Sequence, residues 1–240
     1  MNKIASLILT LAVCFFLCSC KHYEVKDNRV YYDSWNEGSG NNSRLIESAQ
    51  ASSFIELKYS AYGKDDRHVY YEGKIISKAD PKSFEAIGEF FGKDKKSGFY
   101  GDKRVGTSRG KSFKVLKGNY SVDNHDVFYM DEPLNVCSVS SFKIREENNG
   151  WWSQDDCNYF FEEKKLPATD PKTFQILGDT PFAKDSHHVF FQSRRLDYDL
   201  NGRKYVDTID AASFKVVNYF VGHDKFGCID SHEGRISCLD

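Results

Sequence analysis

Residues 64–71, Lys-Asp-Asp-Arg-His-Val-Tyr-Tyr, decide the fold, because the same pattern returns along the chain. Each copy places an aspartate, a few polar residues and then an apolar or aromatic group in the same order, at 93–100, 123–129, 155–161 and 184–191. A shortened copy at 26–32 opens the series, and a degenerate copy at 223–229 closes it. The repeat aspartates follow one another at steps of 29, 29, 32, 30 and 39 residues: Asp65, Asp94, Asp123, Asp155, Asp185 and Asp224. Self-similarity at such a period is typical of tandem structural repeats.

A second anchor runs in phase with the first. A phenylalanine preceded by serine or threonine lies 19 residues after the repeat aspartate in four units, at Phe84, Phe113, Phe142 and Phe174. The two longer units carry Ser53-Phe54 and Ser213-Phe214. Two anchors that keep one offset through four units indicate a repeat, and we call these residues the repeat aspartates and the repeat phenylalanines.

Each unit has the composition of local β-structure. Val69-Tyr70-Tyr71 is followed by a polar turn and a second short apolar run, which predicts a hairpin. Asp80-Pro81 places a capping residue before proline, so we expect one helical turn or a tight turn there. A further apolar run after the repeat phenylalanine predicts a third strand.

Adjacent strand residues point to opposite faces of a sheet, and here both faces are apolar, so both should be covered by neighbouring units. The predicted fold is therefore all-β, with tandem repeats of about 30 residues, each a β-hairpin or three strands, stacked as an open solenoid-like array. The alternative is a closed propeller-like ring, but 30 residues are few for a four-stranded blade.

The N-terminus has the pattern of an export signal. Met1-Asn2-Lys3 precedes an apolar run from Ile4 to Leu17, which is too short to cross a membrane. The next residues, Leu-Cys-Ser-Cys at 17–20, resemble a bacterial lipobox, although Cys18 is not typical of one. The resemblance implies cleavage before Cys20 and acylation of that cysteine; the alternative is an ordinary cleaved signal.

We expect a signal peptide at 1–19, a lipid-anchored tether at 20–24, and one β-repeat domain of about seven units at 25–240, the first and last degenerate. The N-terminal lipid would hold the protein on a membrane of the cell envelope. Lys21 follows Cys20 where an inner-membrane retention signal typically has aspartate, so the resemblance favours the outer membrane, without showing which face.

Four cysteines remain beyond the signal and anchor: Cys137, Cys157, Cys228 and Cys238. An even number in an oxidising compartment predicts two disulfides with three possible connectivities, of which the local pairing of 137 with 157 and 228 with 238 is favoured. These four cysteines lack the Cys-x-x-Cys spacing that is typical of a zinc site.

Charge and composition exclude some classes of function. With 33 Lys and Arg against 35 Asp and Glu, the net charge is −2, which argues against a nucleic-acid partner bound through phosphates. Aromatic residues make up 15% of the chain, 19 Phe, 14 Tyr and 3 Trp, and the repeat assigns most of them to the core. This assignment includes the aromatics three residues before a repeat aspartate: Tyr62, Phe91, Tyr120, Trp152 and Phe182.

Two patterns could indicate chemistry, and both have a structural interpretation. Histidines lie beside the repeat aspartates, at His68, His125, His187, His188 and His223. They could bind a metal, but we expect the aspartates to close Asx-turns and the histidines to be solvated. Gly106-Thr107-Ser108-Arg109-Gly110 matches a nucleophile elbow but lacks the strand and long helix that this motif requires. We therefore predict no catalytic residue, no metal site, no cofactor and no enzymatic activity.

Residues that break the repeat are the better candidates for binding. The first unit is lengthened around 35–42 and the sixth around 198–205, and residues 149–151 form a third irregular loop. Insertions in repeat arrays map to loops that often carry recognition. The predicted binding residues are Trp35, Asn41, Trp151, Tyr198, Arg203 and Tyr205.

The two anchors resemble the DKNYY repeat family of bacterial proteins, whose signature is aspartate, a few polar residues and paired aromatics, followed by an Asp-Pro-x-Ser/Thr-Phe segment. The resemblance covers about 25–229, with departures at Gly98, Tyr159 and the last unit. It implies an exported or lipid-anchored protein and no known chemistry. We expect a non-catalytic module for a protein or glycan partner; the alternatives are an immunity or inhibitor lipoprotein against an exported toxin, and a structural envelope component.

Overall fold

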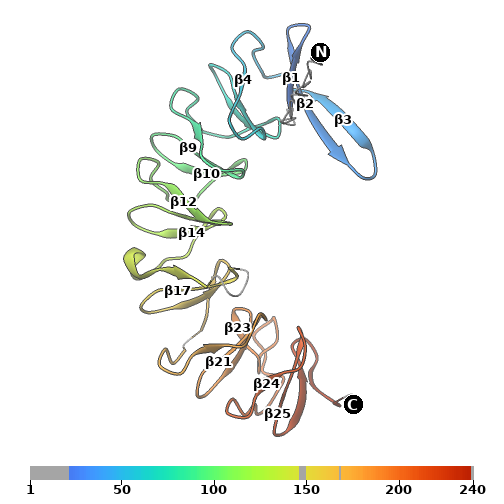
Figure 1. Ribbon diagram of the computed structural model, residues 1–240, viewed down its shortest axis with the longest axis vertical. Helices are drawn as coiled ribbons and strands as arrows, with labels where there is room; N and C mark the ends of the chain where they lie inside the picture. The colour runs from blue at the N-terminus through green and yellow to red at the C-terminus, as the bar shows by residue number, and fades with distance from the viewer. Residues whose placement is uncertain (1–21, 146–149, 168, 239–240) are drawn as a thin grey trace, which may run out of the picture.

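The computed structural model describes residues 22–145, 150–167 and 169–238, and every regular element in them except one is a β-strand. The exception is a 3-10 turn, η1 (Val139–Ser141). The strands form seven small antiparallel sheets, which do not close into a barrel (Figure 1). Within these residues no helix has the length and apolar character needed to cross a membrane. The predicted all-β class is confirmed.

The first sheet has three strands, β1 (Tyr23–Lys26), β2 (Arg29–Asn36) and β3 (Gly40–Leu45). The second and third sheets contain β4 (Ile55–Glu56), β5 (Tyr62–Lys64), β6 (Val69–Tyr71) and β7 (Lys74–Ile75), then β8 (Glu85–Ala86), β9 (Phe91–Lys93), β10 (Gly98–Tyr100) and β11 (Lys103–Arg104). The fourth contains β12 (Lys114–Lys117), β13 (Tyr120–Val122), β14 (Val127–Tyr129) and β15 (Glu132–Pro133).

The remaining three sheets repeat this order. They contain β16 (Lys143–Ile144), β17 (Trp152–Gln154), β18 (Tyr159–Phe161) and β19 (Lys164–Lys165), then β20 (Gln175–Ile176), β21 (Phe182–Lys184), β22 (Val189–Phe191) and β23 (Arg194–Arg195). The last contains β24 (Lys215–Val216), β25 (Val221–Asp224), β26 (Gly227–Asp230) and β27 (Gly234–Ile236).

Six of the seven sheets have four strands, not the two or three expected for each unit. The strand that was missed begins at the aromatic residue three positions before the repeat aspartate, as β9 does at Phe91. It pairs with the strand that follows the previous repeat phenylalanine, as Ala86 of β8 pairs with Gly92 of β9. Because these strands have only two to four residues, four of them fit in one unit of about 30 residues, and the expectation that such a unit is short for four strands is wrong.

The repeat phenylalanines lie between consecutive sheets. The ring of Phe84 packs against Tyr62 of the sheet before it and Phe99 of the sheet after it, with ring centroids 5.6 Å apart in both pairs. Phe113 contacts Phe91 and Phe128, and Phe174 contacts Trp152 and Phe190, in the same way. Each cluster thus joins two neighbouring sheets, which confirms that both faces of the paired-aromatic strands are covered.

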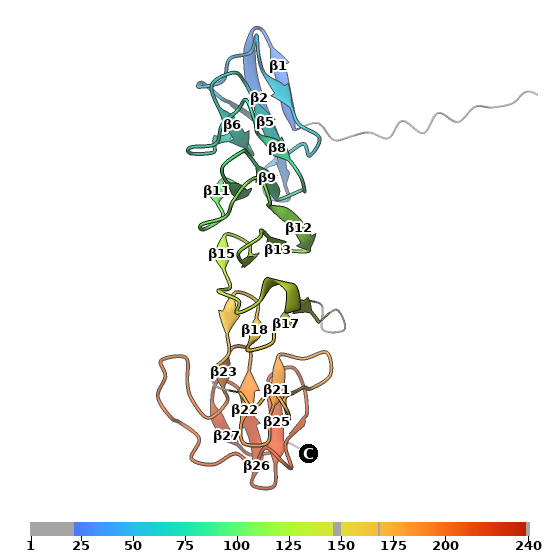
Figure 2. The ribbon, with the colours of Figure 1, turned by 90° about the vertical axis from the view of Figure 1, so that its left-hand side faces the viewer.

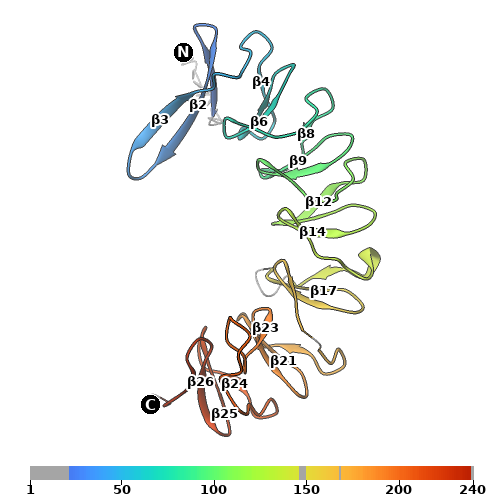
Figure 3. The ribbon, with the colours of Figure 1, turned by 180° about the vertical axis from the view of Figure 1, so that it is seen from behind.

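Consecutive sheets lie next to one another in chain order along a curved row (Figures 1 and 2). The first and last sheets are at opposite ends of the row, and the β2–β3 hairpin projects on its inner side (Figure 3).

The first strand begins at Tyr23, so part of the segment expected as a tether at 20–24 belongs to the first sheet. The predicted signal peptide and Cys20 lie outside the described residues.

Two disulfides close local loops, Cys137–Cys157 and Cys228–Cys238, with sequence separations of 20 and 10 residues. Of the three connectivities open to four cysteines, the structure has the favoured local one. Loops of this size stabilise a fold by about 3 kcal/mol each, because the crosslink reduces the entropy of the unfolded chain.

Candidate functional site

The repeat aspartates are buried and fully engaged in hydrogen bonds to backbone N–H groups. Asp94 is 3% exposed, and its Oδ1 accepts bonds from the N–H groups of Lys96 and Ser97 at 2.7 and 2.8 Å. Its Oδ2 accepts a bond from the N–H of Asp80, 14 residues earlier, at 3.0 Å. The first oxygen closes the predicted Asx-turn, and the second fastens the preceding turn to it.

The other repeat aspartates do the same. Their Oδ2 atoms accept backbone N–H groups of the preceding turn, from Gln50 to Asp65, Arg109 to Asp123, Cys137 to Asp155, Asp170 to Asp185 and Asp210 to Asp224. The hydroxyls before the repeat phenylalanines complete this network. Ser83 donates to Asp80 at 2.8 Å and accepts the N–H of Lys95 at 3.2 Å. The most regular polar residues of the chain therefore hold the fold together.

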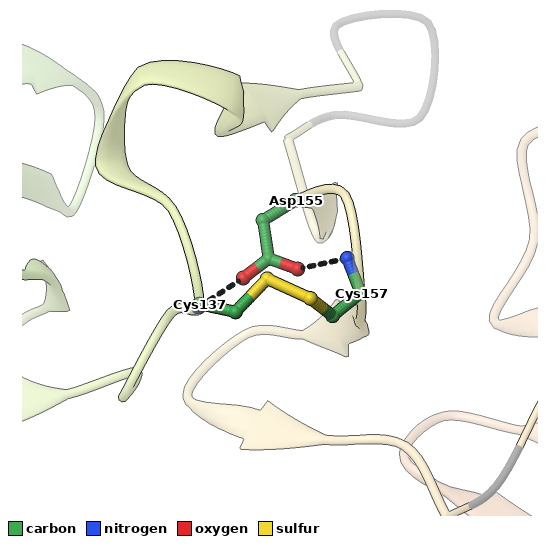
Figure 4. A group of neighbouring side chains, drawn as sticks. All are labelled: Cys137, Asp155 and Cys157. Atoms are coloured by element: carbon green, nitrogen blue, oxygen red, sulfur yellow. Dashed lines mark hydrogen bonds between the residues drawn. A yellow bond between two sulfur atoms is a disulfide. The ribbon is translucent and has the colours of Figure 1, made fainter.

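One group of potential metal ligands occurs among the described residues, at Cys137, Asp155 and Cys157 (Figure 4). Both sulfur atoms are already joined in a disulfide, so neither offers a thiolate. The Asp155 carboxylate accepts the N–H groups of Cys137 and Cys157 at 2.7 and 2.8 Å. The group does not fit a metal ion. None of the turn histidines belongs to a group of three potential ligands within the described residues.

Ser108, in the pattern of a nucleophile elbow, is 1% exposed. Its hydroxyl donates to the carbonyl of Val105 at 2.6 Å and accepts the N–H of Gly98 at 2.9 Å. A serine nucleophile needs an adjacent base and an open approach, and these contacts give Ser108 a structural role in the turn.

The buried carboxylates make the fold sensitive to acid. Burial raises the pKa of Asp65. The hydrogen bonds from the N–H groups of Gln50, His68 and Arg67 and from the hydroxyl of Tyr70 lower it by more, so the pKa lies below its usual range. Burial is likewise outweighed at Asp185 by three backbone N–H groups and at Asp224 by Arg235, and both pKa values are lowered.

Because the folded pKa is below the unfolded value of about 4, these groups stabilise the fold above that pH, and the contribution is lost as the pH falls through the folded pKa. We expect the melting temperature, followed by circular dichroism, to be steady near neutrality and to fall progressively below pH 4. Asp65→Asn should be less stable at pH 7 and should show a flatter acid dependence. A melting temperature independent of pH down to 2 would contradict this.

The predicted binding residues fall into two groups. Arg203 forms an ion pair with Asp199 at 2.9 Å, and the half-buried Tyr205 donates its hydroxyl to the carbonyl of Ser231 at 3.0 Å. Trp151 is half-buried against Phe161, with ring centroids 6.3 Å apart. These contacts shape the irregular loops, and Tyr205 packs against the core of the last sheets and is not a free binding residue.

Trp35 and Asn41 differ, because they are exposed and lie directly opposite each other on β2 and β3. A groove of about 510 Å³ surrounds them, lined also by His22, Glu24, Asp33, Ser34, Asn42 and Ser43. Tyr198 lines a second groove of about 700 Å³ beside the sixth-unit loop, where the Arg195 guanidinium lies over its ring.

The second groove is cationic, and its basic residues were missed from the sequence: Lys164, Lys165, Arg194 and Arg195. They belong to β19 and β23, the last strands of consecutive sheets, which only the stacking brings together.

Around Trp35, residues 31, 33 and 35 alternate onto one face of the strand, and this alternation is the sequence signal that could have identified Asp33 as a neighbour of Trp35. The two grooves do not meet, and Trp151 lines neither.

A family model described as the DKNYY family matches the chain twice, over residues 23–164 and 104–228. Together the two matches span 23–228 and include the repeat aspartates and phenylalanines. No curated protein and no solved structure matches the chain.

Proposed function

The chain belongs to the DKNYY family, and from this premise we propose that it is a lipid-anchored protein of the cell envelope whose β-repeat domain is a non-catalytic binding module. The signal-like run at 4–17 and the lipobox-like residues 17–20 support export and acylation at Cys20. Lys21 favours the outer membrane over the inner one. The two disulfides fit an oxidising compartment.

One observation carries the proposed binding role: the polar side chains that repeat are engaged internally, whereas three polar side chains around Trp35 in the first unit are free. The repeat aspartates each accept several backbone hydrogen bonds. By contrast, Asp33, Asn41 and Ser43 have side chains that make no hydrogen bond or ion pair within the described residues. A surface with free donors and acceptors beside an exposed aromatic ring is suited to recognition.

The array itself is proposed to be open and solenoid-like, with its end sheets apart. Such an array leaves the inner side of the curve accessible to a partner, where the β2–β3 hairpin projects. Insertions on one side of a repeat scaffold are a common means of recognition.

Two measurements test the proposal. Labelling with a palmitate analogue should mark the wild-type protein and Cys18→Ser but not Cys20→Ser, and loss of label in neither variant would overturn anchoring at Cys20. Capture from envelope extract should return at least one component that is lost with the double variant Trp35→Ala, Tyr198→Ala and kept with Val217→Ala, an exposed residue outside both grooves. A component list unchanged by the double variant would contradict the binding role.

A further inference from the structure

The outer part of the β2–β3 hairpin is a two-stranded arm, residues 33–43. Strand β1 pairs with β2 from Tyr23 opposite Tyr32 to Lys26 opposite Arg29, and the N–H of Asp33 donates to the carbonyl of His22 at 2.7 Å, so the arm is uncovered beyond Asp33. The arm is held by its own ladder, in which Asp33 faces Ser43 and Trp35 faces Asn41. Asn36 closes the tip, because its side-chain oxygen accepts the N–H groups of Gly38 and Ser39 at 3.0 and 2.8 Å.

One face of this arm combines an aromatic ring with free polar groups. Residues 33 and 35 alternate to the same side of β2, and their partners Asn41 and Ser43 point to that side from β3. The inward face is different, because Val30 and Tyr32 are buried in the first core cluster. Trp35 is 67% exposed, the most exposed aromatic side chain of the described residues.

The Trp35 ring contributes nothing to the core, since it makes no contact with another ring in the described part of the chain. Asp33, Asn41 and Ser43 offer acceptor oxygens, an amide with two donors, and a hydroxyl, all without partners among the described residues. Glu24, opposite Tyr31 and therefore on the same side, adds a second carboxylate. The arm thus presents hydrogen-bonding groups around a flat apolar surface.

The charge of the groove narrows the class of ligand. Its lining contains two carboxylates, Glu24 and Asp33, and no lysine or arginine. An anionic polymer would be repelled, whereas a neutral ligand rich in hydroxyls could donate to the carboxylates and to the Asn41 oxygen. A sugar ring has such hydroxyls on its rim and C–H groups on its face, and the C–H face can pack on an indole ring.

We propose that the arm binds a neutral saccharide, with Trp35 stacking on a sugar ring and Asp33, Asn41 and Ser43 bonding its hydroxyls. This rests on the proposed role of the domain as a binding module and names the class of ligand. The groove volume of about 510 Å³ lies within the usual range for small-ligand sites. The site is separate from the cationic groove that Tyr198 lines.

The test is a titration of the full-length protein in detergent with two neutral probes, the tetramer of N-acetylglucosamine and the tetramer of glucose. We expect at least one to bind, seen by calorimetry and by a change in tryptophan emission, since Trp35 is exposed whereas Trp151 is half-buried and Trp152 is buried. Trp35→Ala should weaken binding more than tenfold and abolish the emission change, Trp35→Tyr should restore part of the affinity, and Asn41→Ala should weaken binding severalfold.

Val217→Ala is the matched control, an exposed apolar residue far from the arm in sequence, and should bind as the wild type does. All variants should melt as the wild type does, because the altered side chains are exposed. Equal affinity of wild type and Trp35→Ala, or binding of neither probe, would overturn the proposal.

Other outcomes separate this inference from the binding role itself. If no probe binds but a protein captured from envelope extract is lost with Trp35→Ala, the saccharide inference is wrong and the binding module stands. If Trp35→Ala instead removes a concentration-dependent dimer seen by sedimentation, a second copy occupies the arm and the saccharide inference is also wrong. Binding of polyglutamate at the arm would show that the two carboxylates do not exclude an anionic polymer, and the inference of a neutral ligand would then be wrong.

Discussion

Asp94→Ala is expected to lower the free energy of unfolding by about 4 kcal/mol, the largest effect of any single polar substitution that we predict. The carboxylate accepts three backbone N–H groups, those of Lys96, Ser97 and Asp80. Hydrogen bonds to a charged acceptor contribute roughly 1.5–3 kcal/mol each, and alanine would leave all three donors without it. Urea denaturation followed by circular dichroism measures the difference.

Asp102 provides the matched control, because it is an exposed aspartate in the next turn of the same sheet. Asp102→Ala should change the free energy of unfolding by less than about 0.5 kcal/mol. Asp94→Asn should have an intermediate effect, since an amide keeps one acceptor oxygen but presents a donor in place of the other. A loss below 1 kcal/mol for Asp94→Ala would show that the repeat aspartate does not hold the turns together.

Gly110→Ala is expected to destabilise the protein by about 3 kcal/mol or to prevent folding of the third and fourth sheets. A Cβ atom at this position would lie 1.9 Å from the carbonyl oxygen of Asp94 and 2.7 Å from the backbone nitrogen of Ser97. Both are backbone atoms of the Asx-turn, so relief of the overlap requires the turn itself to move. The same bonds that Asp94 makes would then be strained.

Gly38→Ala is the control for this substitution. A Cβ atom there would meet only the Asn36 side-chain oxygen, at 3.6 Å, which is an ordinary contact. The melting temperature of Gly38→Ala should therefore stay within a few degrees of that of the wild type, whereas that of Gly110→Ala should fall by well over 5 °C. Equal melting temperatures for the two variants would mean that the turns pack less closely than the structure has them.

The position two residues before the repeat aspartate shows what could not be predicted from the sequence. It is glycine in several units, and a Cβ atom on Gly92 would lie 2.2 Å from the ring of Phe84. Ser121, Ser153 and Ala183 occupy the equivalent position in other sheets and are almost fully buried. The pattern of small residues is visible in the sequence, but its reason is a ring that comes from the preceding segment and packs across the strand.

The binding candidates show the same limit. The insertions were visible as departures from the repeat, which located Trp35, Asn41, Tyr198, Arg203 and Tyr205. Whether a side chain in an insertion is free depends on what the loop folds against, and Tyr205 is engaged with Ser231, 26 residues away. The cationic groove depends even more on tertiary structure, because Lys165 and Arg194 come from different sheets.

By itself, the sequence determined the period of the repeat, the all-β class, the Asx-turns at the repeat aspartates and the preference for local disulfides. These features depend on groups within a few residues of each other, or on short loops, and a local pattern is enough to specify them. Only the tertiary structure decided that the sheets have four strands, that each repeat phenylalanine lies between two sheets, and that the second carboxylate oxygen fastens the turn 14 to 18 residues before it. Those features require segments of neighbouring units to meet, and the burial of aromatic surface between sheets provides the free energy that brings them together.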